Sequence, residues 1–413
     1  MSFPRYPSYK DSGVEWLGEV PAHWEACRNK VVFSEIDDRA KEVDAELLTV
    51  SHITGVTPRA QKEVNMFMAE TLVGYKRCQP GDLVINTMWA WMGALGCSPC
   101  RGLVSPAYNV YRPRDQSIVL PRFYDYLCRV PSHRTVMKAC SSGVWESRLR
   151  LYPDVFLSMR LAFPPISEQL QIAAFLDQET GKIDALLAEQ RQLMDLLNQE
   201  VASLVLSSFD NSRTKEVRFR DAAEIISRPV LQQRGESYTR IGLFNRGRGL
   251  FHKDASETDD MGESDFFWVE EGDLIISGQF AWEGSVALAG KEDAGCVVSH
   301  RYPVLRGRAG IALTEYLLGL LYTKHGDFLL NENSRGAAGR NRPLNIASLM
   351  REGIPVPDMQ IQENVARAIH SKNALFKEIA KQADLLQERR TALISAAVAG
   401  QIDVRPLAAK KAA

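Results

Sequence analysis

The chain has 413 residues, which exceeds one ordinary domain and predicts two or three domains at about 150 residues each. Its composition, 45% hydrophobic and 24% charged, is that of a soluble globular protein, and it has no apolar run near the ~20 residues that a membrane span needs. A formal net charge of -1 excludes a globally basic protein, so any DNA-binding surface must be local.

The N-terminus and the cysteines indicate the compartment. The opening MSFPRYPSYKDSG has no apolar signal-peptide core, so we expect a cytoplasmic protein. Seven cysteines, an odd number, do not form a disulfide framework and should be reduced. Cys97 and Cys100 have a C-x-x-C spacing, with Cys128, His133 and Cys140 downstream. A zinc site is the alternative, but without a second close ligand pair we favour incidental thiols and no metal.

The first half of the chain begins with short β-like runs, such as residues 82–85, separated by Gly, Pro and Asn turns. Residues 81–93 read GDLVINTMWAWMG. A proline stop at residues 163–167, FPPIS, then opens a long helical pattern with Ser167 as its expected N-cap. Apolar residues recur there at heptad spacing: Ile172, Leu186 and Leu193 in one row, and Leu176, Ile183, Leu197 and Leu204 in another.

The second half repeats the first. Residues 272–284, GDLIISGQFAWEG, match residues 81–93 without a gap at an offset of 191. Pro357 and Gln362 match Pro164 and Gln169 at an offset of 193. A second proline stop leads into a helix from Ile361 to about Ala397, with Asp358 as the expected N-cap and with Val365, Ile379, Leu386 and Leu393 at seven-residue steps.

These patterns predict an α+β protein with two tandemly repeated mixed α/β domains and two long helices, packed as an antiparallel coiled-coil-like pair. Each helix should have about 35 residues and a length of roughly 50 Å. The alternative is two unrelated amphipathic helices, each buried on its own domain. Their matched position within the repeat favours the pair.

Three stretches resemble the specificity (S) subunits of type I restriction-modification systems. Residues 9–24, YKDSGVEWLGEVPAHW, are similar to the family's opening segment almost residue for residue. Residues 393–404, LISAAVAGQIDV, are similar to its closing signature, and residues 164–169, PPISEQ, resemble its proline-to-helix junction. The first helix ends LVLSS, without the Val-x-Gly found near the C-terminus, and the second junction has Gln360-Ile361 where the first has Ser167-Glu168. These departures leave the helix ends open.

The resemblance implies a DNA-recognition subunit with four parts. These are an N-terminal segment with target-recognition domain 1 (1–163), a central helical spacer (164–210), target-recognition domain 2 (211–355), and a C-terminal helical spacer and tail (356–413). Each domain would read one half of a bipartite asymmetric site on double-stranded DNA, and the helices would set the half-site centres on the order of one to one and a half turns apart.

The resemblance also implies partners. Two adenine-N6 methyltransferase (M) subunits and restriction/motor (R) subunits would bind this chain, and S-adenosylmethionine, ATP and Mg would be held by those subunits, with no cofactor on this chain. Its own motifs agree, because it has no Asn/Asp-Pro-Pro-aromatic tetrapeptide and no phosphate-binding loop. We therefore expect a non-catalytic subunit. The alternatives are a self-sufficient DNA modification enzyme and a protein-interaction scaffold.

Candidate DNA-reading residues are polar or basic side chains in glycine-rich loops and at strand ends, because Arg, Asn and Gln can bond base edges. Two loops at corresponding places before the helices supply Ser142, Arg148 and Arg150 in the first half and Arg335, Arg340, Asn341 and Arg342 in the second. Weaker candidates are Asn86, Gln279, Arg246 and Arg248. Trp91 and Trp282 could face bases, but a repeated Trp after a β-run is more often in the core, so we expect core packing.

Overall fold

The computed structural model describes residues 3–14, 16–42, 45–61, 71–115, 117–143, 145, 149–258, 261, 264–336 and 342–407. The chain forms two compact units. Unit 1 consists of Met1–Leu187 and Ala383–Ala413, and unit 2 consists of Ala188–Gln382. None of the helices in the described part of the chain is long and apolar enough to cross a membrane.

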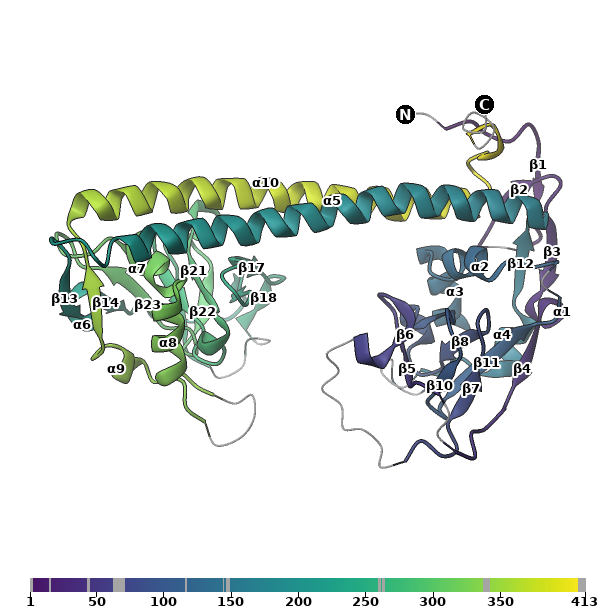
Figure 1. Cartoon of the computed structure of the whole chain (residues 1–413), viewed down its shortest axis with the longest axis horizontal. Coiled ribbons are helices and arrows are strands. Elements are labelled where there is room, and N and C mark those ends of the chain that lie inside the picture. The colour runs from purple at the N-terminus through teal and green to yellow at the C-terminus, as the bar shows by residue number, and fades with distance from the viewer. Residues whose placement is uncertain are drawn as a thin grey trace. The chain divides into compact units, whose positions relative to one another are not determined.

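Unit 1 is built around a four-stranded antiparallel sheet with strand order β4-β11-β8-β9 (Figure 1). Its strands are, in that order, Phe33–Ile36, Tyr108–Pro113, Leu83–Asn86 and Leu95–Cys97. Side chains alternate between the two faces of a strand. Leu83 and Ile85 of β8 therefore enter the main core with the helices, while Val84 packs on the other face in a smaller core formed with the hairpins.

In the described part of unit 1, four short strand pairs and four short helices surround this sheet. The pairs are β1–β2 (Tyr9–Asp11, Glu19–Pro21), β3–β12 (Glu25–Arg28, Arg160–Phe163), β5–β6 (Leu48–Ser51, Gly55–Pro58) and β7–β10 (Lys76–Cys78, Gly102–Val104). The helices are α1 (Asn29–Val32), α2 (Pro121–Leu127), α3 (Pro131–Cys140) and α4 (Pro153–Ser158), and 3-10 turns cover Arg59–Gln61 (η1) and Ala90–Met92 (η2). The last three helices begin with proline, whose fixed φ suits the first helical position.

Unit 2 repeats this plan, with the sheet order β14-β23-β20-β21. Its strands are Ala223–Ile226, Val304–Gly307, Leu274–Ile276 and Val286–Leu288. The flanking pairs are β13–β24 (Lys215–Arg218, Gly353–Val356), β15–β18 (Ser237–Tyr238, Ser256–Glu257), β16–β17 (Ile241–Leu243, Leu250–His252) and β19–β22 (Phe266–Trp268, Val297–Ser299). The helices are α6 (Phe219–Ala222), α7 (Thr314–Leu321), α8 (Lys324–Glu332) and α9 (Ile346–Leu349), with 3-10 turns at Ala281–Glu283 (η5) and Lys291–Asp293 (η6).

The two long helices are α5 (Ile166–Ser207, 42 residues) and α10 (Met359–Val398, 40 residues). In unit 1, Ile172 near the start of α5 shares a core with Leu393 near the end of α10. In unit 2, Val205 near the end of α5 shares a core with Val365 near the start of α10. The helices therefore pack antiparallel. The predicted fold, two sheet-containing domains with a pair of long helices, is confirmed.

The starts of these helices differ in one detail from the sequence prediction. Asp358 is an N-cap, because its Oδ1 accepts the N–H of Ile361 at 3.1 Å. Ser167 is not an N-cap, because α5 already begins at Ile166. Both helices are also longer than the expected length of about 35 residues.

A buried glutamine anchors the start of each long helix. Gln169 and Gln362 are fully buried. The side-chain oxygen of each accepts a backbone N–H at 2.8 Å, from Leu120 and Leu313 respectively. The side-chain nitrogen of each donates to two carbonyls, of residues 118 and 164 in unit 1 and of residues 311 and 357 in unit 2. The repeated Pro and Gln therefore belong to one anchor that exists in both units.

The three stretches that carry the family resemblance meet at one place in unit 1. Glu168, buried at the start of α5, accepts hydrogen bonds from the Tyr6 hydroxyl at 2.6 Å and from the Trp24 indole at 2.9 Å. His23 lies 2.7 Å from its other oxygen. The Tyr9 hydroxyl donates to the carbonyl of Gly400 in the C-terminal segment at 3.1 Å. The N-terminal segment, the helix junction and the C-terminal signature thus form one packed junction.

Candidate nucleic-acid interface

Both copies of the Gly-Asp-Leu motif form a tight turn that leads into a central strand. Gly81 and Gly272 have φ values of +88° and +85°, a conformation that favours glycine. Asp82 and Asp273 are buried, and each accepts at 2.8 Å the backbone N–H of the residue three positions earlier. The motif therefore closes the turn before β8 and β20.

The same aspartates hold an arginine of the neighbouring strand. Arg112 of β11 donates two hydrogen bonds of 2.8 Å to Asp82. In unit 2, Arg306 of β23 pairs with Asp273 at 2.7 Å, and Arg228 pairs with it at 2.8 Å. Because these carboxylates are buried, the arginines that neutralise them belong to the scaffold of each unit.

The Ala-Trp-x-Gly elements form η2 and η5, and their tryptophans are not core residues. Ala90 and Ala281 are fully buried, whereas Trp91 and Trp282 are only partly buried. The Trp91 indole N–H donates to the carbonyl of Met88 at 3.0 Å. The expectation of core packing is therefore wrong, because the small alanine fills the core position and leaves the indole at the edge of the unit.

A basic side chain covers each of these indoles. The Lys138 ammonium lies 5.6 Å from the centre of the Trp91 ring, and the Arg342 guanidinium lies 5.1 Å from that of Trp282. Such a contact orients the cation and is worth about 0.5–1 kcal/mol at exposed sites. Each unit thus presents a ring and a cation next to η2 or η5.

Two loops occupy equivalent places in the units. Loop 1 (residues 142–150) joins α3 to α4, and loop 2 (residues 334–344) joins α8 to α9. An isolated antiparallel β-bridge between the first and last residue closes each loop at its base. In loop 1, the two backbone hydrogen bonds of this bridge are both 3.0 Å long.

The end of each loop is also tied to the segment that follows the central strand. The N–H of Leu151 donates to the carbonyl of Thr87 at 3.1 Å, and that of Leu344 donates to the carbonyl of Gly278 at 2.8 Å. Loop 1 therefore lies beside η2, and loop 2 lies beside η5.

The predicted loop residues are exposed where the structure describes them. Ser142 and Arg150 are exposed in loop 1. In loop 2, the Arg335 side chain is 80% exposed and pairs with Glu332 at 2.6 Å. Arg342 is partly buried, and its Nε donates to the carbonyl of Ser334 at 3.0 Å, which fixes the guanidinium beside Trp282. The predictions for Arg148, Arg340 and Asn341 lie outside the described residues.

The hairpin turn of unit 2 (turn 2, residues 244–249) carries two more predicted residues. Arg246 and Arg248 are exposed. The Arg246 N–H donates to the carbonyl of Glu283 at 3.0 Å, and the N–H of Gly247 donates to that of Gly284 at 2.9 Å. Turn 2 therefore packs on η5, and the structure gathers Arg246, Arg248 and Arg342 around that element.

The two strand-end candidates differ in exposure. Gln279 is exposed, two residues before η5. Asn86 is only 7% exposed, and its side-chain oxygen is buried with no hydrogen-bond partner among the described residues. Gln279 is thus presented at the surface, whereas Asn86 lies beneath it.

A pair of exposed aromatic residues at equivalent positions beside η2 and η5 was not among the predictions. Trp89 in unit 1 and Phe280 in unit 2 immediately precede η2 and η5, and they are 46% and 39% exposed. They occupy the same position of the repeat, directly before Ala-Trp. This aligned pair of aromatic residues could have identified them from the sequence. Aromatic side chains can contact thymine methyl groups in the major groove.

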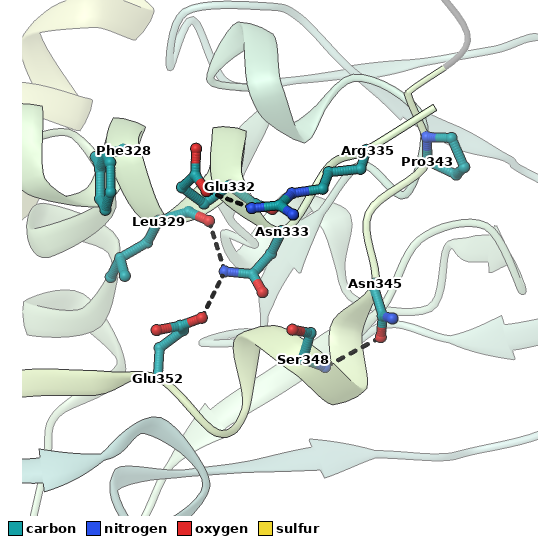
Figure 2. Close-up of a pocket in the computed structure, with 9 residues that line it drawn as sticks. All are labelled: Phe328, Leu329, Glu332, Asn333, Arg335, Pro343, Asn345, Ser348 and Glu352. Carbon is teal, nitrogen blue, oxygen red and sulfur yellow. Dashed lines mark hydrogen bonds and ion pairs between the residues drawn. The ribbon is translucent and has the colours of Figure 1, made fainter. Parts of the chain in front are cut away.

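A pocket of about 470 Å³ lies at the base of loop 2 (Figure 2). Its polar groups pair with one another. Asn333 donates to the carbonyl of Leu329 at 2.9 Å and to Glu352 at 3.2 Å, while Asn345 accepts the N–H of Ser348 at 3.0 Å. These bonds join residues on both sides of loop 2, so they hold the base of the loop.

The cysteines are free thiols in this structure. Cys97 donates to the carbonyl of Pro121 at 3.0 Å, and burial raises the pKa of Cys97 and of Cys128 well above the usual value. Within the described ranges, no group of three or more His, Cys, Asp or Glu side chains is placed to hold a metal ion.

Solved structures resemble this chain, whereas the sequence comparisons found no match. No protein-family model matches the sequence, and no curated protein matches it. A chain from a structural study of complex assembly and conformational transition of the type I R-M system is 15% identical, with a TM-score of 0.57 over 92% of this chain and 98% of that chain.

Two further matches are S subunits. The HsdS subunit from Thermoanaerobacter tengcongensis is 16% identical, with 93% of this chain and 98% of that chain covered and a TM-score of 0.42. The type I restriction-modification S subunit from M. genitalium is 14% identical, with 91% and 96% covered and a TM-score of 0.44. The TM-score of 0.57 shows that this chain has the fold of a protein of the type I R-M system.

Proposed function

We propose that this chain is the DNA-recognition (specificity) subunit of a type I restriction-modification complex, in which each unit reads one half of a bipartite asymmetric site. The observation that carries the proposal is the duplication of one exposed loop set on two copies of one fold. Loop 1 beside η2 and loop 2 beside η5 are anchored by equivalent backbone bonds but carry different side chains. Two such readers would recognise two different half-sites.

Readout would depend on arginines whose positions are fixed by the fold of each unit. A guanidinium can bond the O6 and N7 atoms of guanine together, or bind a phosphate. The Arg342 guanidinium is held by the carbonyl of Ser334 and by the Trp282 ring, and the backbone of Arg246 is held by the carbonyl of Glu283 in η5. Such contacts restrict the arginines before binding and lower the entropy lost when the side chain binds a base.

Catalysis would come from the partners. We propose two methyltransferase (M) subunits and restriction/motor (R) subunits, which would hold S-adenosylmethionine, ATP and Mg. The antiparallel helices would fix the separation of the half-sites, since 42 and 40 residues correspond to about 60 Å of helix each. Exposed leucines, such as Leu193 and Leu196 of α5, offer apolar surface for a partner.

A binding experiment tests the proposal. The chain, assembled with its methyltransferase partners, is tested on duplexes that carry the methylated site or a scrambled one. Replacing Arg335 and Arg342 by Ala should weaken specific binding by about 1–3 kcal/mol for each lost base contact, because no other donor replaces the guanidinium. The matched control is Arg213→Ala, since Arg213 is 77% exposed and also paired with a carboxylate, that of Asp358.

Exchange of residues 20–160 for those of a related subunit completes this test. It should change one half of the recognised site and leave the other half intact. A change in both halves would contradict one reader for each half-site. Equal binding of specific and scrambled DNA by the unaltered complex would favour the protein-interaction scaffold, and methyl transfer by the chain alone would establish an enzyme.

A further inference from the structure

Each unit carries a short hairpin on the face of the central sheet opposite the helices. Its strands are β5 and β6 in unit 1 and β16 and β17 in unit 2. The connection in unit 1, turn 1 (residues 51–55), exposes His52 and Ile53, the latter by 73%. Turn 2 exposes Arg246 and Arg248 in the same place. The two turns occupy equivalent positions but expose side chains of different chemistry.

A glycine of each hairpin packs directly on a residue one or two positions after the end of α7 or α2. In unit 2, a Cβ added to Gly247 would lie 2.5 Å from Cε1 of Tyr322. In unit 1, a Cβ added to Gly55 would lie 2.0 Å from Nη2 of Arg129. Both glycines have positive φ, +62° and +68°. Arg129 and Tyr322 are 193 positions apart, as are Gln169 and Gln362, so they are equivalent in the repeat.

Tyr322 is clamped between turn 2 and the long helices. Its hydroxyl donates to the carbonyl of Gly247 at 3.5 Å. On the other side, the Lys372 ammonium of α10 lies 4.2 Å from the centre of the ring and donates to Asn198 of α5 at 3.1 Å. Lys372 is only 3% exposed, so this contact is a fixed part of the helix pair. The position of the ring, and with it the turn, follows from the helices.

Arg129 is fixed by different chemistry. Two hydrogen bonds of 2.7 and 2.8 Å join its guanidinium to Asp125 of α2. Asp125 in turn accepts the N–H of Cys97 in β9 at 3.0 Å. Arg129 also lines a pocket of about 360 Å³ together with Thr180 of α5 and Arg390 of α10. It therefore holds turn 1 against a helix and the central sheet.

The backbone of turn 2 depends on this support. Arg246 has φ +58°, a conformation that costs a non-glycine residue free energy and persists only where neighbouring contacts hold it. The Ser285 hydroxyl donates to the Asn245 side chain at 2.7 Å, next to the two backbone bonds of Arg246 and Gly247 to η5. Together with the contact between Tyr322 and Gly247, these bonds hold Arg246 and Arg248 in a fixed orientation.

We infer that Tyr322 and Arg129 are equivalent positioning residues, each of which holds a hairpin turn that contacts DNA as a second reading element beside loop 2 or loop 1. The inference rests on the proposed function, since it requires each unit to read half of a site. It assigns DNA contact to turn 1, whose exposed His52 and Ile53 differ from the arginines of turn 2. The two turns would thus select different bases from one framework.

The test is base discrimination at each position of the site by the complex with its methyltransferase partners, together with the thermal unfolding of the chain. Tyr322→Leu should lower discrimination by about tenfold in one half of the site only, because turn 2 loses the aromatic ring on which Gly247 packs and the hydrogen bond from its hydroxyl. Gly247→Ala should have the same effect by pushing the turn off the ring. Arg129→Met should relax discrimination in the other half.

The matched control is Tyr316→Phe. Tyr316 is also a tyrosine of unit 2, fully buried where Tyr322 is partly buried, and its hydroxyl donates to the carbonyl of Pro355 at 2.5 Å, away from the turn. This variant should lower the unfolding temperature and leave discrimination unchanged. If Tyr322→Leu and Gly247→Ala also lower only the unfolding temperature, the positioning role is wrong while the proposed function stands. If the unaltered complex itself does not discriminate, the proposed function fails and the inference fails with it.

Discussion

The arginine side chains of the two units fall into two groups, those bound to a buried carboxylate and those exposed in loops. Arg112 and Arg306 are bound to the buried carboxylates Asp82 and Asp273, so they belong to the scaffold. Arg246 and Arg335 extend from loops into solvent. The sequence alone does not separate these groups, because the scaffold pairs join residues about 30 positions apart on neighbouring strands. Burial of the partner carboxylate distinguishes them.

At the residue scale, His133 gives unit 1 a predicted response to acid. It is fully buried, and burial lowers its pKa to about 4. Its Nδ1 lies 3.2 Å from the carbonyl of Cys128, which can only accept, so the neutral ring carries its proton on Nδ1. In the unfolded chain the pKa is about 6.5. Between pH 6.5 and 4 the unfolded chain therefore binds a proton that the folded chain does not.

As the pH falls through this window, His133 should lower the free energy of unfolding by up to roughly 3 kcal/mol, and almost none of this loss should occur above about pH 7.5. His133→Asn, which keeps a donor for Cys128 but does not titrate, should remove this part of the pH dependence. Thermal unfolding at pH 4.5 and 7.5 measures it. The exposed His300, changed to Asn, is the control. An unchanged pH dependence in His133→Asn would show that another group is responsible.

At the element scale, the glutamine anchors determine where the long helices begin. Gln169→Leu would leave the N–H of Leu120 and two carbonyls without their partner, and Gln362→Leu would do the same in unit 2. Each unsatisfied buried group costs about 1–3 kcal/mol. Calorimetry should therefore show a clear loss of stability for either variant. Gln192→Leu, at an exposed position of α5, is the control, and an equal loss there would contradict the anchor.

The sequence predicted the strands and helix starts of the repeat but not its turns or the exposure of its tryptophans. The Gly-Asp-Leu runs and the Pro and Gln of each junction predicted equivalent strands and helix starts, because turn glycines and a buried amide are required in both units. The equivalence of turn 1 and turn 2 was missed, since Ser-His-Ile-Thr-Gly and Phe-Asn-Arg-Gly-Arg-Gly share little beyond glycine. Core packing of Trp91 and Trp282 was wrong because burial depends on which neighbour fills the space, here Ala90 and Ala281.

At the scale of the whole molecule, the chain consists of two copies of one fold joined by two helices that run through both. The copies keep their anchors, the buried glutamine and the buried aspartate, and differ in their loops and turns. A duplicated framework with divergent loops suits recognition of two different half-sites at a fixed separation. A symmetric site would need identical loops.

The most direct test of this account is a map of methylated adenines on DNA modified by the complex that contains this chain. If the chain has the proposed function, the map should show one asymmetric motif with two specified parts, separated by a spacer of fixed length and unspecified sequence. Lengthening or shortening α5 and α10 together should change the spacer and leave both parts intact. A single continuous motif, a palindrome, or methylation that does not depend on this chain would contradict the central claim.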